Sequence, residues 1–443
     1  MLKTFRGGVH PNDMKAPTQD KKIINLPAPP ELVFPLGQHI GAPCTPCVSV
    51  GDAVCMGQKI GESAGFVSAC IHSSVSGSVK AIEKRMHPNG YFVQSVVIEN
   101  DGLDTMDASV KKPDKSYKNM TKNEITEIIK NAGIVGMGGA TFPTHVKLSP
   151  PAEAKIDYII VNGAECEPYL TSDYRAMLET TDNVIGGLQI LLHMFGLKIG
   201  YIGIEDNKPE AISVMKQAAS LVKDVEIVIV PLKTKYPQGG EKQLINVVTG
   251  RKLAPGQLPY QVGTIVHNID TCASIYRAVT LGRPLMHRIV TIGGDCISTP
   301  SNLRIRIGTP FRALFDGVGG FIESPEKVIM GGPMMGMALP NIDVPTIKGT
   351  SGALAFSANL SKQLEETACL RCGKCVYVCP MGLLPNVLDS AARERDFEKL
   401  EKFNISDCME CGSCAFVCPS KRRQVQQIKV AKDMLKNRQI KAK

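Results

Sequence analysis

Two runs of four cysteines near the end of the chain share one spacing, and this spacing constrains the fold more than any other feature. Each run reads CxxCxxCxxxCP. The runs comprise Cys369, Cys372, Cys375 and Cys379, then Cys408, Cys411, Cys414 and Cys418. Such a run holds a cubane [4Fe–4S] cluster, because closely spaced thiolates can wrap several corners of one cluster.

The repeated spacing also predicts which cysteine binds which cluster. The first three cysteines of a run share a cluster, and the fourth reaches the other cluster. The first predicted ligand set is Cys369, Cys372, Cys375 and Cys418. The second is Cys408, Cys411, Cys414 and Cys379. Zinc and disulfides are the alternatives, but zinc sites are typically built from isolated CxxC pairs, and disulfides are rare in a reducing compartment.

The other seven cysteines do not share this spacing. Cys44 and Cys47 form a CxxC that could be redox-active or half of a metal site, although no second pair lies near them in the sequence. Four more are predicted to be small core residues: Cys55, Cys70, Cys272 and Cys296. Cys166 lies in an acidic turn that is discussed below.

The net charge of +9 comes almost entirely from one end of the chain. Residues 420–443 hold nine Lys and Arg and one Asp, which leaves the other 419 residues nearly neutral. We therefore expect no nucleic-acid partner. We predict a basic tail over 421–443, either solvated or in contact with anionic lipid or an acidic membrane protein. Its possible apolar stripe comprises Val425, Ile428, Ala431 and Leu435.

No transmembrane helix or signal peptide is predicted. The longest mostly apolar stretch, 184–204, is interrupted by Gln189, His193 and Lys198. The first ten residues lack the apolar segment of a signal peptide. These features favour a cytoplasmic location.

The chain of 443 residues divides into units that differ in their pattern of apolar residues and therefore in predicted secondary structure. Residues 1–105 have the short apolar runs of an all-β unit. Residues 118–285 alternate strands and helices, which predicts a parallel α/β sheet, and Thr121 with Glu124 predicts a helix-capping box. Residues 286–350 are again strand-like. A stretch rich in Ser, Gly and Ala then leads to the cysteine segment, 360–420.

A glycine-rich loop and an acidic turn are the candidate binding elements of the α/β unit. The loop contains Gly136, Gly138 and Gly139 and is followed by Lys147. Such loops can cradle phosphate with backbone N–H groups, although a tight structural turn is the alternative. The strand at 157–165 ends in NGAECEP, at the edge where parallel sheets bind ligands.

These stretches resemble the flavin-binding 51-kDa-type subunit of respiratory complex I. That family carries GRGGAGFPTGxKW and NADExEPGTxKDR, and the matching stretches are GMGGATFPTHVKL and NGAECEPYLTSDYR. YPQGGEKQLI and TIVHNIDT are also similar. The departures are Met137, Leu148, Ala164 and His267.

The resemblance implies a set of cofactor-binding residues. The residues implied to contact flavin mononucleotide (FMN) are Gly136, Gly138, Gly139, Lys147, Asn162 and Asn268. Glu165, Glu167 and Glu205 are implied to lie around the flavin and the nicotinamide. An alternative is that Glu165 and Glu167 only anchor a loop.

The N-terminal unit resembles a barrel-sandwich hybrid domain related to lipoyl and biotinyl carriers. Its predicted hairpin tip, 63–67, contains no lysine, so we expect a docking role and not a carrier role. The whole order is a barrel-sandwich domain, a Rossmann-like FMN domain, a β-grasp module of the SLBB type and a helical two-cluster ferredoxin domain. This order resembles the RnfC family, which belongs to the Rnf complexes.

The RnfC resemblance implies a membrane-bound ferredoxin:NAD⁺ oxidoreductase that translocates Na⁺ or H⁺. It implies non-covalent FMN, NAD(H) as substrate, and partners among the membrane and iron–sulfur subunits, with ferredoxin acting indirectly. The chain would be peripheral, on the cytoplasmic side. No catalytic acid or base is nominated. The alternatives are a microcompartment-type cobalamin reductase, where the barrel-sandwich piece is expected at the C-terminal end, and a non-enzymatic relay or docking protein.

Overall fold

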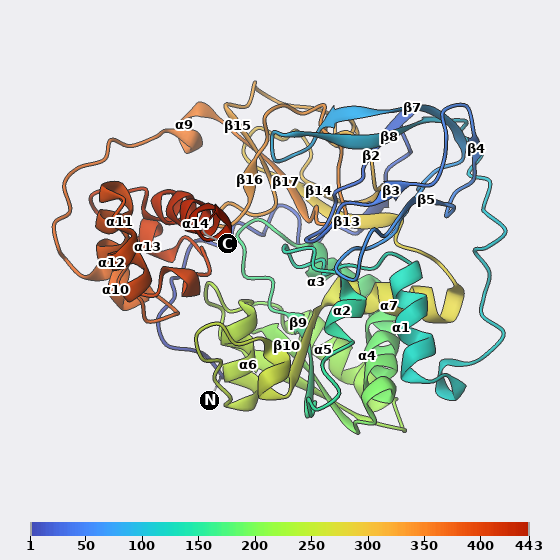
Figure 1. Cartoon of the computed structure of the whole chain (residues 1–443), viewed down its shortest axis with the longest axis horizontal. Coiled ribbons are helices and arrows are strands. Elements are labelled where there is room, and N and C mark those ends of the chain that lie inside the picture. The colour runs from blue at the N-terminus through green and yellow to red at the C-terminus, as the bar shows by residue number, and fades with distance from the viewer. Residues whose placement is uncertain (1, 442–443) are drawn as a thin grey trace.

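A four-stranded parallel sheet forms the predicted α/β unit in the computed structural model, which describes residues 2–441 (Figure 1). The sheet order is β11-β10-β9-β12 and every pair is parallel. The strands are β9 (Tyr158–Gly163), β10 (Ile199–Glu205), β11 (Glu226–Leu232) and β12 (Thr264–Asn268). The predicted strands and crossover helices are therefore confirmed.

Helices cover both faces of this sheet. One face packs against α1 (Lys122–Asn131), α4 (Thr181–Phe195), α5 (Pro209–Ser220) and α7 (Ile269–Leu281). The other face packs against α6 (Glu241–Thr249) and the side chain of Phe5. Two shorter helices, α2 (Thr144–Lys147) and α3 (Ser172–Glu179), follow the glycine loop and the acidic turn. The capping box of Thr121 and Glu124 is present at α1, as predicted.

The N-terminal unit is a sandwich of two small antiparallel sheets. The first has the order β2-β8-β7-β4 and comprises β2 (Glu31–Pro35), β4 (Ala53–Val54), β7 (Gly77–Met86) and β8 (Phe92–Asn100). The second comprises β3 (Thr45–Pro46), β5 (Lys59–Glu62) and β6 (Ile71–His72). Phe34, Ile60 and Ile98 belong to the one buried cluster between the sheets, as a barrel-sandwich requires.

A six-stranded mixed sheet follows, in the order β1-β14-β13-β17-β15-β16. Its strands are β1 (Ile23–Asn25), β13 (His287–Gly293), β14 (Ser301–Arg306), β15 (Lys327–Met330), β16 (Met337–Ala338) and β17 (Gly352–Phe356), with α8 (Phe311–Asp316) packed beside them. Strand β17 lies inside the stretch that we expected to be a connection. Its small residues fit because the strand is central and buried along its whole length.

The cysteine segment folds into a helical unit beside the α/β unit (Figure 1). It contains α10 (Lys374–Val378), α11 (Pro385–Glu394), α12 (Phe397–Lys402), α13 (Ser413–Phe416) and α14 (Gln424–Lys441), and α9 (Ala358–Ser361) precedes it. The basic tail is helix α14 of this unit. Its stripe of Val425, Ile428, Ala431 and Leu435 is buried inside the unit, so these apolar side chains do not face lipid. Contact of the basic side chains with anionic lipid or an acidic membrane protein stays a prediction.

Residues 2–25 form a strap that crosses three units. Lys3 bridges Leu232 at the edge of the parallel sheet. The N–H of Gly8 donates to the carbonyl of Val378 (2.8 Å) in the cysteine unit. Strand β1 then pairs in parallel with β14. The start of the predicted unit 1–105 thus joins the other units together and lies outside the barrel-sandwich.

We predict that the buried stripe of α14 stabilises the cysteine unit. Ile428 is 1% exposed and Val430, on the same helix, is 51% exposed. Replacing Ile428 with Ala should lower the unfolding free energy of this unit by about 2–5 kcal/mol, because a buried cavity remains. Val430→Ala should change it by less than about 0.5 kcal/mol. Thermal loss of cluster absorbance would measure both, and equal transitions would contradict this packing.

Candidate functional site

The glycine loop lies against the first turn of α7, at the carboxyl end of the parallel sheet. The N–H of Met137 donates to Thr271 Oγ1 (2.9 Å), and Arg288 Nη2 donates to the carbonyl of Met137 (3.2 Å). Arg288 forms a buried ion pair with Asp270 of α7. The loop is therefore held from both sides by buried polar groups.

The glycines leave bare backbone on this loop. A Cβ at Gly138 would lie 3.4 Å from Cβ of Asn268, and Gly139 has a φ of +122° and faces open space. Asn268 caps α7, because its Oδ1 accepts from the N–H of Asp270 (2.9 Å). Its Nδ2 donates to Asp173 Oδ2 (2.6 Å). The structure thus brings together the loop and Asn268, as the resemblance implied.

Several polar groups of the α/β unit are buried and unpaired within residues 2–441. They are Thr144 Oγ1, His267 Nε2 and both amide atoms of Gln238. Burial lowers the pKa of His267 to about 3, so the ring is neutral. Lys147 Nζ pairs with Glu241 Oε1 (2.8 Å) and also donates to the carbonyl of Val266 (3.3 Å). Unpaired buried groups of this kind fit a polar ligand, and a bare glycine loop fits an anionic one.

The acidic turn joins β9 to the loop that precedes α6. Asn162 Nδ2 donates to the carbonyl of Gly239 (2.8 Å), and the N–H of Gly239 lies 3.4 Å from Cys166 Sγ. A Cβ at Gly239 would approach the carbonyl of Ala164 to 2.3 Å, so only glycine fits there. Burial raises the pKa of the Cys166 thiol.

The three predicted glutamates are all engaged within the chain. Glu165 accepts from the N–H groups of Asp173 (2.8 Å) and Tyr174 (3.2 Å) in the first turn of α3. Glu167 accepts from the N–H groups of Met334 (3.0 Å) and Met335 (2.9 Å). These two carboxylates anchor a helix and a loop, as in the alternative weighed above. Their role toward nicotinamide stays a prediction.

Two charged residues that sequence analysis missed lie beside these glutamates. Lys208 Nζ pairs with Glu205 Oε2 at 3.1 Å, and both side chains are buried. Burial, followed by the negative charge of Glu165, raises the pKa of Asp173 to about 8. Asp173 stands in the quoted stretch TSDYR, so its place in that stretch was the available signal.

Four of the eight predicted cluster ligands line one cavity. They are Cys379, Cys408, Cys411 and Cys414, the second predicted ligand set. Across the part of the chain that the structure describes, no three His, Cys, Asp or Glu side chains are close enough to hold a single metal ion. The structure thus brings the four cysteines of the second predicted ligand set together around one cavity.

Hydrogen bonds of Ser420 hold the two ends of the first predicted ligand set together. The N–H of Thr367 donates to the carbonyl of Ser420 (3.0 Å), and Ser420 Oγ donates to the carbonyl of Ala368 (2.9 Å). These bonds bring the start of the first run beside Cys418. Cys369 and Cys372 are exposed, whereas Cys375 is buried. Cys375 and Cys414 share a small buried cluster, which connects the two ligand sets.

The second ligand set contacts the loop that also touches Asn162. Tyr236 is buried, and its hydroxyl donates to the carbonyl of Cys411 (2.7 Å). Gln243 Nε2 donates to the carbonyl of Pro380 (3.3 Å), next to Cys379. Tyr236 and Gln243 lie in YPQGGEKQLI, which was noted only as a similar stretch and received no predicted role.

Models of protein families match four successive parts of the chain. They are the RnfC barrel sandwich hybrid domain (residues 3–103), the Nuo51 FMN-binding domain (129–277), the SLBB domain (289–338) and the 4Fe-4S dicluster domain (361–419). The predicted order of domains is confirmed. The barrel-sandwich match lies at the N-terminal end, opposite to the order expected of a cobalamin reductase.

Curated relatives match over almost the whole length. The C subunit of the proton-translocating ferredoxin:NAD(+) oxidoreductase complex of Clostridium ljungdahlii is 49% identical, covering 98% of this chain and 94% of the relative. The Na(+)-translocating counterpart of Acetobacterium woodii is 47% identical, covering 97% and 96%. This chain belongs to the RnfC family. A third member, from Rhodobacter capsulatus, is 40% identical and covers 91% of this chain and 77% of the relative.

A solved structure shares the fold of this RnfC chain. It is an NAD⁺-reducing [NiFe]-hydrogenase in the H₂-reduced state, with a TM-score of 0.50 and 16% identity, covering 72% of this chain and 64% of the hydrogenase chain. Within residues 2–441 of this RnfC chain, no helix combines the length and the apolarity needed to cross a membrane.

The other cysteines of this RnfC chain have separate surroundings. Cys44 Sγ donates to the carbonyl of Ala69 (3.1 Å), and Cys47 Sγ to that of Lys59 (3.3 Å). The predicted core positions are confirmed for three cysteines, whereas Cys55 is only half-buried. The three are Cys70, Cys272 and Cys296.

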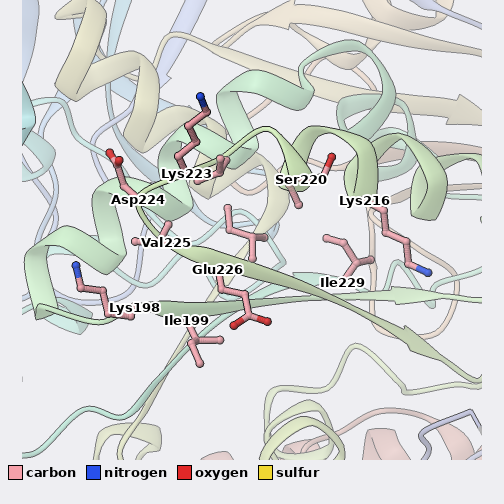
Figure 2. A pocket seen from close by; sticks show the side chains of 12 residues that line it. Lys198, Ile199, Lys216, Ser220, Lys223, Asp224, Val225, Glu226 and Ile229 are labelled. Atoms are coloured by element: carbon pink, nitrogen blue, oxygen red, sulfur yellow. The ribbon is translucent and has the colours of Figure 1, made fainter.

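A surface hollow lies at the opposite end of the parallel sheet. Figure 2 shows it between α5 and β11, with Lys198, Lys216 and Lys223 around it. It lies at the amino ends of β10 and β11, whereas ligands of parallel α/β sheets bind at the carboxyl ends. This hollow therefore takes no part in the candidate site.

Proposed function

We propose that this chain exchanges electrons between NAD(H) and two iron–sulfur clusters within a membrane-bound ferredoxin:NAD⁺ oxidoreductase. The observation that supports this most directly is the contact between the two candidate sites. The loop 236–243 binds Asn162 through Gly239 on one side and the backbone of Cys411 through Tyr236 on the other. One short loop therefore connects the flavin-type site with the second ligand set.

In this proposal, the glycine loop and its neighbours hold FMN. Gly138 and Gly139 offer backbone N–H groups, Lys147 offers a positive charge, and Asn162 and Asn268 stand at the carboxyl ends of β9 and β12. The N–H of Gly136 already donates to the carbonyl of Phe142 (2.8 Å), so Gly136 would line the site without donating to the flavin. A bound flavin accepts a hydride from nicotinamide and passes electrons on singly. The buried, unpaired groups of His267 and Gln238 are then available to a bound ligand.

The proposal also gives the two clusters an order. The set of Cys379, Cys408, Cys411 and Cys414 lies next to the loop 236–243, so it would exchange electrons with the flavin. The set that contains Cys369 and Cys372 has exposed ligands and would exchange electrons with a partner. The shared contact of Cys375 and Cys414 supports transfer between the sets.

The names of the curated relatives support the wider assignment. They describe subunits of complexes that couple ferredoxin:NAD(+) oxidoreduction to proton or Na(+) translocation. We propose that this chain works in such a complex, attached through membrane and iron–sulfur subunits on the cytoplasmic side. Ferredoxin would act indirectly, through those partners.

Anaerobic reconstitution tests the proposal. The chain should bind about eight iron atoms, because two cubane clusters hold four each, and one non-covalent FMN. NADH should bleach the flavin absorbance and then the cluster absorbance. A chain that binds iron but neither retains FMN nor responds to NADH would contradict the enzymatic proposal and favour the relay or docking alternative.

The charge of Lys147 should matter for flavin retention. Lys147→Met should raise the Kd for FMN by about tenfold or more, because a charge-assisted hydrogen bond contributes about 1.5–3 kcal/mol. Glu241→Gln is the matched control, since it removes the ion-pair partner of Lys147 and keeps the charge of the lysine. Its Kd should stay equal or fall. Fluorescence titration of flavin-free protein measures both, and an unchanged Kd in Lys147→Met would contradict the assignment.

The order of the clusters can be tested by removing them one at a time. In Cys372→Ala, NADH should still reduce the cluster of the second set. In Cys411→Ala, NADH should reduce only the flavin, because the path to the outer cluster is interrupted. Electron paramagnetic resonance distinguishes these outcomes, and Cys296→Ala serves as a buried-cysteine control. NADH-dependent reduction of the outer cluster in Cys411→Ala would overturn the order.

A further inference from the structure

The two cysteine runs repeat each other in backbone conformation as well as in sequence. Arg371 and Glu410 occupy equivalent positions and have φ values of +52° and +59°. Gly373 and Gly412 follow with φ values of +72° and +82°, and each caps a short helix. The surroundings of equivalent residues can therefore be compared directly.

The second run is covered by other parts of the chain. A Cβ at Gly240 would lie 2.8 Å from Met409 Cε, so Met409 packs on the loop 236–243. A Cβ at Gly412 would lie 3.1 Å from the carbonyl of Met334. Glu410 pairs with Lys432 (2.6 Å). Met409, the apolar residue of this run, therefore faces the loop 236–243, which also binds Asn162 of the flavin-type site.

The equivalent residues of the first run face outward. Leu370, which corresponds to Met409, is 68% exposed. A Cβ at Gly373 would meet nothing within 4 Å. Arg371 takes part in no ion pair within the described chain, unlike Glu410. The first run therefore has the same backbone conformation as the second run, but no other part of the described chain covers it.

The charge around the first run is positive. Segments 362–374 and 420–423, which the bonds of Ser420 hold together, contain six basic and two acidic side chains. Lys374 and Lys421 are exposed and have no ion-pair partner among residues 2–441. An oxidised cubane with four thiolates carries a charge of −2, which offsets only part of this surplus. A complementary partner would carry acidic groups around its own redox centre.

We infer that the face formed by Leu370, Arg371, Lys374 and Lys421 docks an acidic one-electron iron–sulfur protein. This inference rests on the proposed function. One electron leaves the reduced cluster of the partner and enters the oxidised cluster held by the first ligand set, and no proton or group moves with it. The reverse transfer uses the same face.

The test uses the full, reconstituted chain and a pre-reduced acidic bacterial ferredoxin, which serves as a soluble stand-in for the iron–sulfur partner subunit. Stopped-flow absorbance measures how fast the ferredoxin reduces the clusters. In wild type, the second-order rate constant should fall at least tenfold between 50 and 500 mM salt, because screening weakens electrostatic attraction. Lys374→Glu combined with Lys421→Glu should lower the low-salt rate constant at least tenfold and remove most of the salt dependence.

A matched control places the same charge change on the hollow of Figure 2. Lys198→Glu combined with Lys223→Glu changes the net charge equally, at exposed positions of the α/β unit. Its rate constant should stay within about twofold of wild type. Leu370→Gln tests the apolar part of the face and should slow the reaction without altering its salt dependence. Equal losses in both double variants, or a loss in neither, would overturn the inference.

Two further measurements identify a different occupant. Sedimentation would reveal a dimer that the Lys374/Lys421 variant dissociates, which would replace the partner protein with a second copy of this chain. Flotation with anionic vesicles would reveal lipid binding that depends on the same lysines. Either result, together with an unchanged ferredoxin rate, overturns the inference. Failure of NADH to reduce wild-type clusters would instead count against the proposed function.

Discussion

The half-buried carboxylate of Glu167 connects four parts of the molecule. It accepts from two backbone N–H groups of the loop 331–336, beside the mixed sheet, and lies 3.5 Å from the Tyr236 hydroxyl. That hydroxyl bonds Cys411 in the cysteine unit. The carbonyl of Glu167 accepts from Lys15 of the N-terminal strap (2.9 Å). Burial raises the pKa of Glu167, and a carboxylate at such a place is tolerated because these donors satisfy it.

Local patterns in the sequence predicted the elements that depend on local physics. The capping box of Thr121 and Glu124 needs only four residues, and the alternation of strands and helices fixes a parallel sheet. Strand β17 escaped prediction because Gly352–Phe356 is small and lacks the β-branched residues typical of strands. Its place in the sheet is set by β13 and β15, which are distant in sequence.

Some residues of the candidate site could likewise be predicted from local spacing, whereas others depend on tertiary contacts. Spacing alone predicted the ligand set that lines the cavity, which is Cys379 with Cys408, Cys411 and Cys414. The rule used is that the fourth cysteine of each run binds the cluster of the other run, and it needs only the local sequence. Glu165 and Glu167 are different. Their position in the sequence predicts carboxylates at the end of a strand. Only the tertiary structure shows which backbone N–H groups donate to them. Tyr236 and Gln243 were missed for the same reason, since their partners lie more than a hundred residues away.

The N-terminal strap has a consequence for the order in which the molecule is assembled. Synthesis runs from the N-terminus, so residues 2–25 are made before the units that they join, yet Gly8 bonds Val378 and Ile24 pairs with Leu303. These residues must remain unpaired on the ribosome until most of the chain has emerged. The relative placement of the α/β unit, the mixed sheet and the cysteine unit is then fixed late, by a segment of high sequence separation, and such closures are slow steps in folding. Cluster insertion into the cysteine unit therefore has a time window in which that unit is still free of its neighbours.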